Sequence, residues 1–332
     1  MAATFWQGRR ALVTGAGGFI GSHLVEQLVR AGAQVRGLVH YNGRGDVGDL
    51  RHLPPDIFDA VERVTGDLID YRSMLDLVEN MDVVFHLGAL IAIPYSYQHP
   101  VHVIQTNILG TTHILEAARL HHTPRVVHTS TSEVYGTAQY VPIDEKHPLH
   151  GQSPYAASKI GADQIAESYF RSFNLPVVTV RPFNTYGPRQ SARAIIPATI
   201  IQALTSDIIK LGDLRPTRDF TFAADTARAF MCAAEAPNAP GQTVNLGTGH
   251  DISIGALAEK IAKIIGKPIQ IIEDEARLRP PASEVMRLLA DNRRAAEVIN
   301  WRPEVSLDDG LAQTIAWVTV HLDQYRPRDY AV

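Results

Sequence analysis

Residues 10–21 read RALVTGAGGFIG, an apolar run that stops at a cluster of glycines. A run of this kind is typical of a buried strand in a parallel sheet. From Ile20 to Ala31, apolar residues recur on one face, which predicts a helix. Gly15, Gly18 and Gly21 stand between the two elements. They fit a turn whose backbone approaches a pyrophosphate, with the helix N-terminus supplying N–H donors and positive potential. Because the turn joins a strand to a helix, it predicts a dinucleotide site.

Strands and helices alternate through the first half of the chain. After the first pair we expect strands at 34–39, 61–65, 83–87, 125–129 and 177–181, and helices at 73–79, 103–120 and 155–173. This alternation predicts an α/β fold: a Rossmann-type, doubly wound parallel sheet that binds its ligands at the carboxyl ends of the strands.

The pattern loosens after about residue 184, where proline and arginine become frequent. We therefore expect a dinucleotide-binding domain over residues 1–184 and a smaller, discontinuous substrate-binding lobe over residues 185–332. Residues 243–246 predict a strand that returns to the large sheet, within a return segment near residues 207–246. Two helices are expected in the lobe, at 196–204 and 254–265.

The composition argues against several classes of partner. The formal net charge of −4 over 332 residues disfavours nucleic acid and anionic membranes. Cys232 is the only cysteine, so no internal disulfide can form. No apolar run reaches the roughly 18 residues of a membrane span, and the N-terminus does not read as a signal peptide, so we expect a cytoplasmic protein. The 14 histidines form no metal-ligand spacing, and we expect no metal site.

Tyr155 and Lys159 share one face of the helix predicted at 155–173, because they are four residues apart. A free phenol has a pKa of about 10 and is a poor base at neutral pH. A nearby ammonium and a positively charged nicotinamide ring would both favour the phenolate. The phenolate could then take a proton from a substrate hydroxyl while a hydride leaves the same carbon.

A second polar motif, TSTSEVYG at residues 129–136, follows the apolar strand predicted at 125–129. It stands at the carboxyl end of that strand, where ligands bind in such sheets. The Thr131 hydroxyl could hydrogen-bond a reacting oxygen, and the Glu133 carboxylate could remove a proton next to a ketone.

Together with RPFNTYGPR at residues 181–189, these motifs resemble the extended short-chain dehydrogenase/reductase family. The resemblance covers nearly the whole chain. It implies a Rossmann fold, a tightly held nicotinamide cofactor and a nucleotide-sugar substrate. In that reading Tyr155 is the base, Lys159 is its activator and a ribose contact, and Thr131 is the hydroxyl partner, with Ser132 and Glu133 completing the catalytic set.

The resemblance also implies binding residues. Cofactor contacts are expected from Gly15, Gly18, Phe19, Ile20, Gly21, Asp67, Leu68, Leu87, Ala89, Asn107, Tyr155 and Lys159. Substrate contacts are expected from Tyr95, Asn184, Arg193, Arg218 and Arg287. The second strand ends LVHYNGR at residues 38–44, without the acid that usually bonds the adenosine ribose. The expected cofactor is therefore NAD, with NADP left open because Arg44 could serve a 2′-phosphate.

Three further stretches, at 92–97, 128–142 and 188–194, are similar to the NAD-dependent 4,6-dehydratases of legionaminic acid biosynthesis. That similarity implies conversion of a nucleotide-linked N-acetylglucosamine to its 4-keto-6-deoxy form. Ser132 departs from the Thr-Asp-Glu of other sugar-nucleotide 4,6-dehydratases, whose aspartate can protonate the leaving hydroxyl. Thr-Ser-Glu instead resembles UDP-glucuronate decarboxylases. A decarboxylase and a 4-epimerase therefore remain alternatives, and a non-catalytic NAD-binding regulator is a remote one.

The family resemblance implies a homodimer as well. Extended members often pair through the helices that correspond here to residues 103–120 and 155–173, forming a four-helix interface. Both predicted helices have apolar faces, but the core of a monomer requires the same pattern.

Overall fold

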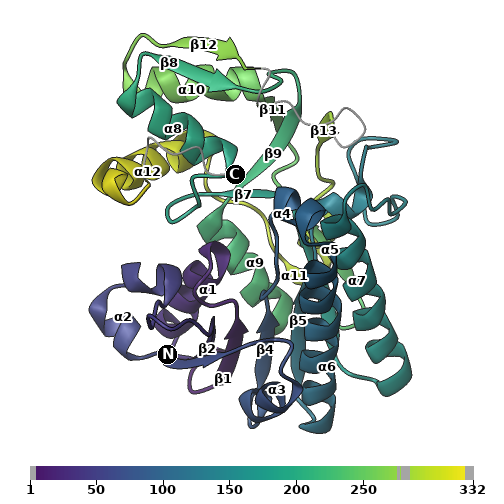
Figure 1. The fold of residues 1–332 in the computed structure, drawn as a ribbon. Helices are drawn as coiled ribbons and strands as arrows, with labels where there is room; N and C mark the ends of the chain where they lie inside the picture. Colours follow the sequence, from purple (N-terminus) through teal and green to yellow (C-terminus); the bar gives the residue numbers. More distant parts are fainter. Residues whose placement is uncertain (1–4, 275–276, 278–284, 326–332) are drawn as a thin grey trace.

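The computed structural model describes residues 5–274, 277 and 285–325. Its main feature is a seven-stranded sheet in the order β10-β6-β5-β4-β1-β2-β3, in which every pair of neighbours is parallel (Figure 1). This confirms the predicted Rossmann-type fold. The strands are β1 (Arg10–Thr14), β2 (Gln34–His40), β3 (Glu62–Gly66), β4 (Val83–His86), β5 (Arg125–Thr129), β6 (Val177–Pro182) and β10 (Thr243–Leu246).

Helices cover both faces of this sheet, which explains the unbroken apolar strands. In β1, Val13 packs into the core shared with one helical layer, while its neighbour Leu12 packs into the core of the other. The first layer contains α1 (Phe19–Arg30), α2 (Pro55–Asp59), α9 (Ala223–Glu235) and α11 (Arg293–Ile299). The second contains α3 (Tyr71–Val78), α6 (Gly110–Leu120) and α7 (Pro154–Phe173).

The continuous helix predicted at 103–120 is wrong in one respect. The structure has α5 (Pro100–Ile104), then a π-helical turn, η2 (Gln105–Leu109), and then α6; the short helix α4 (Ile93–Gln98) precedes them. A π-turn adds about one residue to a single turn, and the apolar positions on either side of it still fit a helical repeat, so periodicity alone does not reveal it.

The smaller lobe has two sheets of its own (Figure 1). One contains β7 (Asn184–Tyr186), β9 (Thr217–Phe222), β11 (Asp251–Ser253) and β13 (Arg287–Leu288); the other pairs β8 (Ile208–Leu211) with β12 (Gln270–Glu273). Three helices, α8 (Ile195–Thr205), α10 (Ile254–Ile265) and α12 (Leu307–Val320), enclose the apolar core of the lobe. The helices predicted at 196–204 and 254–265 correspond to α8 and α10.

The chain passes between the two parts more than once. Strand β10 lies beside β6, with Thr243 level with Thr179, and α9 packs against α1. Within the expected return segment, however, β8 and β9 belong to the small sheets. Further along, α11 and Trp301 pack against the core of the large domain. The boundary therefore follows the packing of individual elements rather than a single cut in the sequence.

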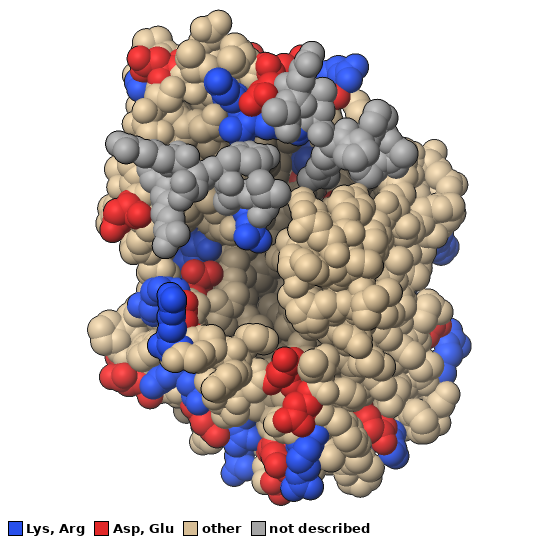
Figure 2. Space-filling model, viewed as in Figure 1, with Lys and Arg blue, Asp and Glu red and all other residues tan. Residues whose placement is uncertain are grey.

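Side chains from the two parts also meet directly, and Figure 2 shows a hollow between the parts. Arg189, which follows β7, pairs with Glu26 of α1 at 2.6 Å, and both side chains are largely buried. His52, at the end of the short helix η1 (Gly48–His52), stacks edge-on against Trp317 of α12, with ring centroids 5.1 Å apart. Among the described residues, no helix is long and apolar enough to cross a membrane.

Candidate active site

The strands of the large sheet point toward the smaller lobe, so their carboxyl ends face it (Figure 1). The loop after β1 lies at this edge and is packed backbone against backbone. Gly15 has a φ of +70°, and a Cβ there would lie 3.0 Å from the backbone of Gly88. A Cβ on Gly21 would overlap the carbonyl oxygen of Gly15. Such a bare turn before α1 fits the pyrophosphate of a dinucleotide.

Gly17 is a third tightly packed glycine, and it is not among the three glycines predicted to form the turn. A Cβ at Gly17 would lie 2.7 Å from the carbonyl oxygen of Val47, and the N–H of Asp49 donates to the Gly17 carbonyl at 2.8 Å. The residues just before η1 therefore pack directly on the glycine loop. Gly18 is the N-cap of α1 and has no side chain to occupy the helix N–H groups, and Phe19 and Ile20 begin the helix.

One of the expected cofactor residues, Asp67, lies next to the end of β2, which lacks an acid. Asp67 follows the neighbouring strand β3, and its carboxylate lies 3.6 Å from His40 Nε2 at the end of β2. Strand β3 thus brings a carboxylate to the place where β2 supplies none. Leu68 is buried against Gly88 and Gly110, while Leu87 and Ala89 flank Gly88 in the segment after β4.

Asn107, another expected cofactor contact, is buried in the π-turn. Its Oδ1 accepts from the Leu90 N–H at 2.8 Å, and its Nδ2 donates to the Leu90 carbonyl and to Ser158 Oγ at 3.0 and 2.9 Å. Asn107 thus connects the segment after β4 to α7 through hydrogen bonds.

Tyr155 lies in the first turn of α7. Ser153 caps this helix by accepting from the Ala156 N–H, and Pro154 occupies its first position, where proline is well tolerated. Burial raises the pKa of Tyr155, the nearby Thr131 hydroxyl opposes that shift, and the charge of Glu133 adds to it.

Lys159 lies one turn further along α7 and is almost fully buried. Its Nζ donates to the carbonyl oxygen of Thr129, at the end of β5, at 2.6 Å. Burial lowers the pKa of Lys159 to about 8, and the nearby charge of Asp163 opposes that shift. The ammonium is therefore mostly charged at neutral pH, as activation of a phenol demands.

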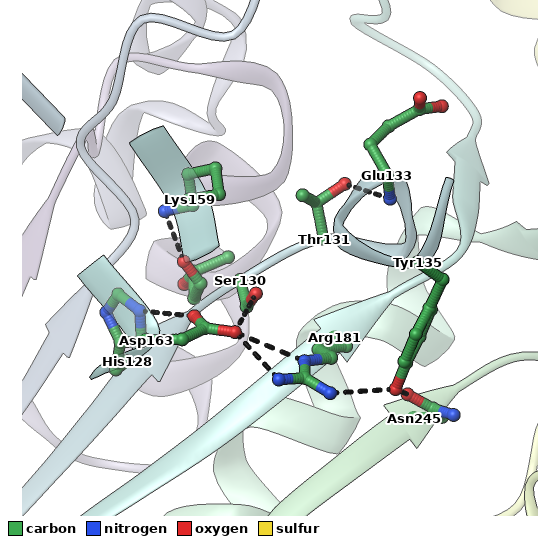
Figure 3. A network of polar contacts seen from close by, with 10 residues as sticks. His128, Ser130, Thr131, Glu133, Tyr135, Lys159, Asp163, Arg181 and Asn245 are labelled. Atoms are coloured by element: carbon green, nitrogen blue, oxygen red, sulfur yellow. Dashed lines mark hydrogen bonds and ion pairs between the residues drawn. The ribbon is translucent and has the colours of Figure 1, made fainter. Parts of the chain in front are cut away.

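Ser132 and Glu133 lie in the 3₁₀ turn η3 (Ser132–Tyr135) that follows β5, and Thr131 caps this turn by accepting from the Glu133 N–H at 3.2 Å. Ser132 is buried. The Glu133 side chain points away from the polar cluster around Lys159 (Figure 3). Within the described parts of the chain, its carboxylate has no hydrogen-bond or ion-pair partner, so it is available to a ligand.

The predicted substrate residues are spread around the smaller lobe and α4. Arg218 is largely buried in β9, and the side chain of Asn184, in the adjacent β7, approaches the carbonyl of Asp219 at 3.5 Å. Arg193 is exposed just before α8. Tyr95 of α4 is hydrogen-bonded to His102 of α5 at 2.9 Å.

Arg287 is not brought together with Arg218. In β13 it stands level with Thr217 of β9, and Arg287 and Thr217 both donate to the carboxylate of Asp251, at 2.7 and 2.6 Å. Arg287 therefore shares the face of Thr217, whereas Arg218 points to the opposite face of the strand. Asp219, beside Arg218, is fully buried and accepts from Thr248, Gly249 and Ala290.

Among residues 5–274, 277 and 285–325, no cluster of histidine, cysteine, aspartate or glutamate could hold a metal ion.

The chain matches the family model described as GDP-mannose 4,6 dehydratase over residues 12–314. It is 36% identical to a UDP-glucose 4-epimerase of Mycolicibacterium smegmatis, covering 92% of this chain and 97% of that protein. It is 31% identical to a UDP-N-acetyl-alpha-D-glucosaminuronate decarboxylase of Bacillus cytotoxicus, covering 93% and 97%. Among solved structures, the dTDP-glucose 4,6-dehydratase DesIV of Streptomyces venezuelae, with NAD bound, superimposes with a TM-score of 0.83 at 28% identity, covering 96% of this chain and 99% of that one.

These matches confirm the family predicted from the motifs, and they include an epimerase, a decarboxylase and a dehydratase. The chain therefore belongs to the extended short-chain dehydrogenase/reductase family and is an enzyme of its nucleotide-sugar dehydratase, epimerase and decarboxylase class.

Proposed function

We propose that this enzyme is an NAD-dependent 4,6-dehydratase that converts a nucleotide-linked N-acetylglucosamine to its 4-keto-6-deoxy form. The observation that carries the proposal is the Glu133 carboxylate, which stands two residues after Thr131 and has no partner among the described residues. A dehydratase needs a second base for the C5 proton in addition to the Tyr155 base that starts the reaction. A 4-epimerase has no use for that second base.

The glycine turn supports NAD as the cofactor, because Gly15, Gly17 and Gly21 leave its backbone bare. The pyrophosphate would lie at the N-terminus of α1, and Asp67 would approach the adenosine. Tyr155 and Lys159 would meet the nicotinamide end. When bound, NAD supplies a reversible hydride acceptor at C4 of the sugar. The carboxylate of Asp67 beside the end of β2 would repel a 2′-phosphate, which favours NAD over NADP.

The first step is the removal of the C4 hydroxyl proton by Tyr155 as the carbon loses its hydride. The Thr131 hydroxyl favours the phenolate of Tyr155, and the charged Lys159, one turn further along α7, would stabilise it as well. The resulting C4 ketone acidifies the C5 proton, which Glu133 removes, and the C6 hydroxyl departs as water by taking up one of the two protons removed from C4–OH and C5. A hydride equivalent returned to C6 and the second proton returned to C5 complete the 4-keto-6-deoxy product, so that no net oxidation occurs.

Ser132 supports a second candidate. Its hydroxyl has no accessible pKa and cannot act as an ordinary general acid for the departing C6 hydroxyl. Decarboxylation of a nucleotide-linked glucuronate also begins with oxidation at C4, but it loses carbon dioxide and needs no acid at C6. The relative from Bacillus cytotoxicus bears the name of such a decarboxylase.

Mass spectrometry of the product separates the candidates. The purified protein is incubated with UDP-, GDP-, CDP- and dTDP-linked sugars, including N-acetylglucosamine and glucuronate. We expect a nucleotide-linked N-acetylglucosamine to lose the mass of one water. Loss of carbon dioxide from a glucuronate nucleotide instead assigns the decarboxylase, and a product of equal mass but altered C4 configuration assigns the epimerase.

We further propose that two copies associate through α5, η2 and α6 together with α7. Exposed apolar side chains along α5 and η2 support this assignment: Val101, Ile104 and Leu109 are 65%, 45% and 48% exposed. In Figure 2 the face over α4 and α5 carries few charged side chains.

A further inference from the structure

Asp163 is a buried acid on α7 that the reaction as described does not use. Its carboxylate accepts four hydrogen bonds from two strands of the sheet (Figure 3). From β5, His128 Nε2 lies at 3.0 Å and Ser130 Oγ at 2.7 Å; from β6, Arg181 reaches it through Nη2 at 2.9 Å and Nε at 3.2 Å. Only 4% of Asp163 is exposed, so this is a fully satisfied carboxylate in the interior.

Asp163 continues a spacing that begins with the catalytic pair. Tyr155, Lys159 and Asp163 occur at intervals of four residues, so they lie on one face of α7. Each meets the end of β5 within three consecutive residues: Tyr155 lies near Thr131, Lys159 donates to the carbonyl of Thr129, and Asp163 accepts from Ser130. The Asp163 contact thus fixes how α7 is aligned along the strand end that carries the catalytic hydroxyl.

The same cluster reaches the turn that carries Glu133. Arg181 Nη1 donates to the hydroxyl of Tyr135 at 2.9 Å, and that hydroxyl donates to Asn245 Oδ1 of β10 at 2.7 Å. Tyr135 is fully buried and stands two residues after Glu133 in η3. Asp163 therefore connects, through one arginine, the helix of the base and the turn of the second base.

We propose that Asp163 is a positioning residue for the proposed reaction, whose carboxylate aligns Tyr155 and Lys159 with the end of β5 and keeps the Lys159 ammonium charged. The inference rests on the proposed function, because the alignment of Tyr155 and Lys159 with the end of β5 affects the reaction only if Tyr155 is its base. Asp163 acts through Lys159 and the strand end, and it is not assigned any contact with substrate.

The electrostatic surroundings of Lys159 leave Asp163 as its main source of negative charge. Burial lowers the pKa of Lys159 to about 8, and Asp163 is the group that raises it. Burial also lowers the pKa values of His86 and His128, which leaves both neutral at pH 7. The groups that face Lys159 are Tyr155 and Asp163 on α7, His86 on β4, His128 on β5 and, beyond Asp163, Arg181 on β6.

The decisive variant is Asp163→Asn, which keeps the size of the side chain and removes its charge. Lysine labelled with ¹³C at Cε is titrated by NMR in the intact protein, and Lys159→Arg assigns the Lys159 signal. We expect the Lys159 midpoint to fall by about one pH unit in Asp163→Asn, and the alkaline limb of kcat to move with it, which is a tenfold loss at the alkaline end. KM should change less than about threefold. An unchanged midpoint and an unchanged profile overturn the proposal.

Asp225→Asn is the matched control, because Asp225 is 3% exposed, pairs with Arg228 at 3.0 Å and lies on α9. The Asp225→Asn variant should be less stable than the wild type without a change in the Lys159 midpoint. An equal shift of the midpoint in this control also overturns the proposal.

If Asp163→Asn does not fold, Ser130→Ala tests the alignment alone. We expect kcat to fall about tenfold at constant KM, and Ser130→Thr to restore it, whereas an unchanged kcat in Ser130→Ala contradicts the role.

The experiment separates this inference from the proposed function. If the wild-type protein turns over no nucleotide sugar, the proposed function fails. The NMR titration needs no turnover, so it still decides whether Asp163 maintains the charge of Lys159.

Discussion

Lys159 and Tyr155 are both buried, and burial shifts each pKa toward the neutral form. At pH 7 the resting pair is a neutral phenol beside a mostly charged ammonium. Catalysis needs the opposite state of the phenol, so the site must stabilise the phenolate when substrate and cofactor are in place. The Thr131 hydroxyl opposes the rise in the pKa of Tyr155, and in the proposed reaction the Lys159 ammonium, one turn further along α7, would favour the phenolate as well. Raising the pH through about 8 discharges Lys159 and removes that support.

Glu133 gives the residue-scale prediction. We expect Glu133→Gln still to oxidise C4, because Tyr155, Lys159 and Thr131 are intact, but to form the 6-deoxy product at least a hundredfold more slowly, the usual effect of losing a general base. Absorbance of the reduced nicotinamide measures the first step, and mass spectrometry measures the product. Glu167→Gln, an exposed acid on α7 paired with Arg171, is the control and should behave as wild type. Formation of the 6-deoxy product at the wild-type rate would remove Glu133 from the base role.

The candidate catalytic side chains could be identified in the sequence because their signals are local, and their roles stay predictions. Tyr155 and Lys159 are four residues apart in one helix, and Thr131 and Glu133 follow a strand. Asp163 continues the same spacing and could have been found that way. The partners of Asp163 could not, because Arg181 and Tyr135 reach it from other elements, and no spacing records a contact made across a sheet.

At the scale of elements, the loop between β1 and α1 has glycines at positions where other backbone segments pack closely against it. Gly15 and Gly21 were readable from their place between a strand and a helix. Gly17 was not, because its neighbours are Val47 and Gly48, thirty residues further along. The π-turn at 105–109 was hidden for a related reason, since the apolar positions on either side of it still fit a helical repeat while the hydrogen bonding changes.

Gly21→Ala tests the loop. Alanine is favoured over glycine inside a helix by about 1 kcal/mol, so propensity alone predicts a gain in stability. The new Cβ would meet the Gly15 carbonyl and the backbone of Ala16, which cannot move aside as a side chain can, and overpacking costs about 1–3 kcal/mol. We therefore expect a lower melting temperature and at least tenfold weaker NAD binding by isothermal titration calorimetry. Gly43→Ala has open space around it and should change neither. Unaltered NAD affinity in Gly21→Ala would refute the packing argument.

At the scale of the whole molecule, the two parts are joined by contacts that the sequence does not reveal. Arg189 and Glu26 meet across the two parts at a largely buried site, and Arg30 also binds Glu26. The parallel sheet was predictable because each βαβ unit is local in sequence. The returns of α9 and β10 fall within the predicted return segment near residues 207–246, whereas the return of α11 was not predicted, because no local pattern records which core a helix packs against.

The apolar side chains along α5 and η2 lead to a prediction about assembly. Ile104 is 45% exposed in one chain, and a homodimer through this face would bury it. Placing an unpaired charge in such an interface costs several kcal/mol, which is at least a hundredfold in the dissociation constant. We expect light scattering to give twice the 36.5 kDa of one chain for the wild type and about one chain for Ile104→Glu.

Val320→Glu makes the same change at a residue of α12 that is 76% exposed and lies outside this face, so it should stay dimeric. Far-ultraviolet circular dichroism checks that both variants are folded. If the wild type is a monomer at all concentrations, or if Ile104→Glu dimerises as tightly as Val320→Glu, the exposed apolar residues on α5 and η2 do not form the dimer interface. If Ile104→Glu is monomeric and inactive at low protein concentration but regains activity at high concentration, the position of α7, which packs against α5 and η2, depends on the second copy.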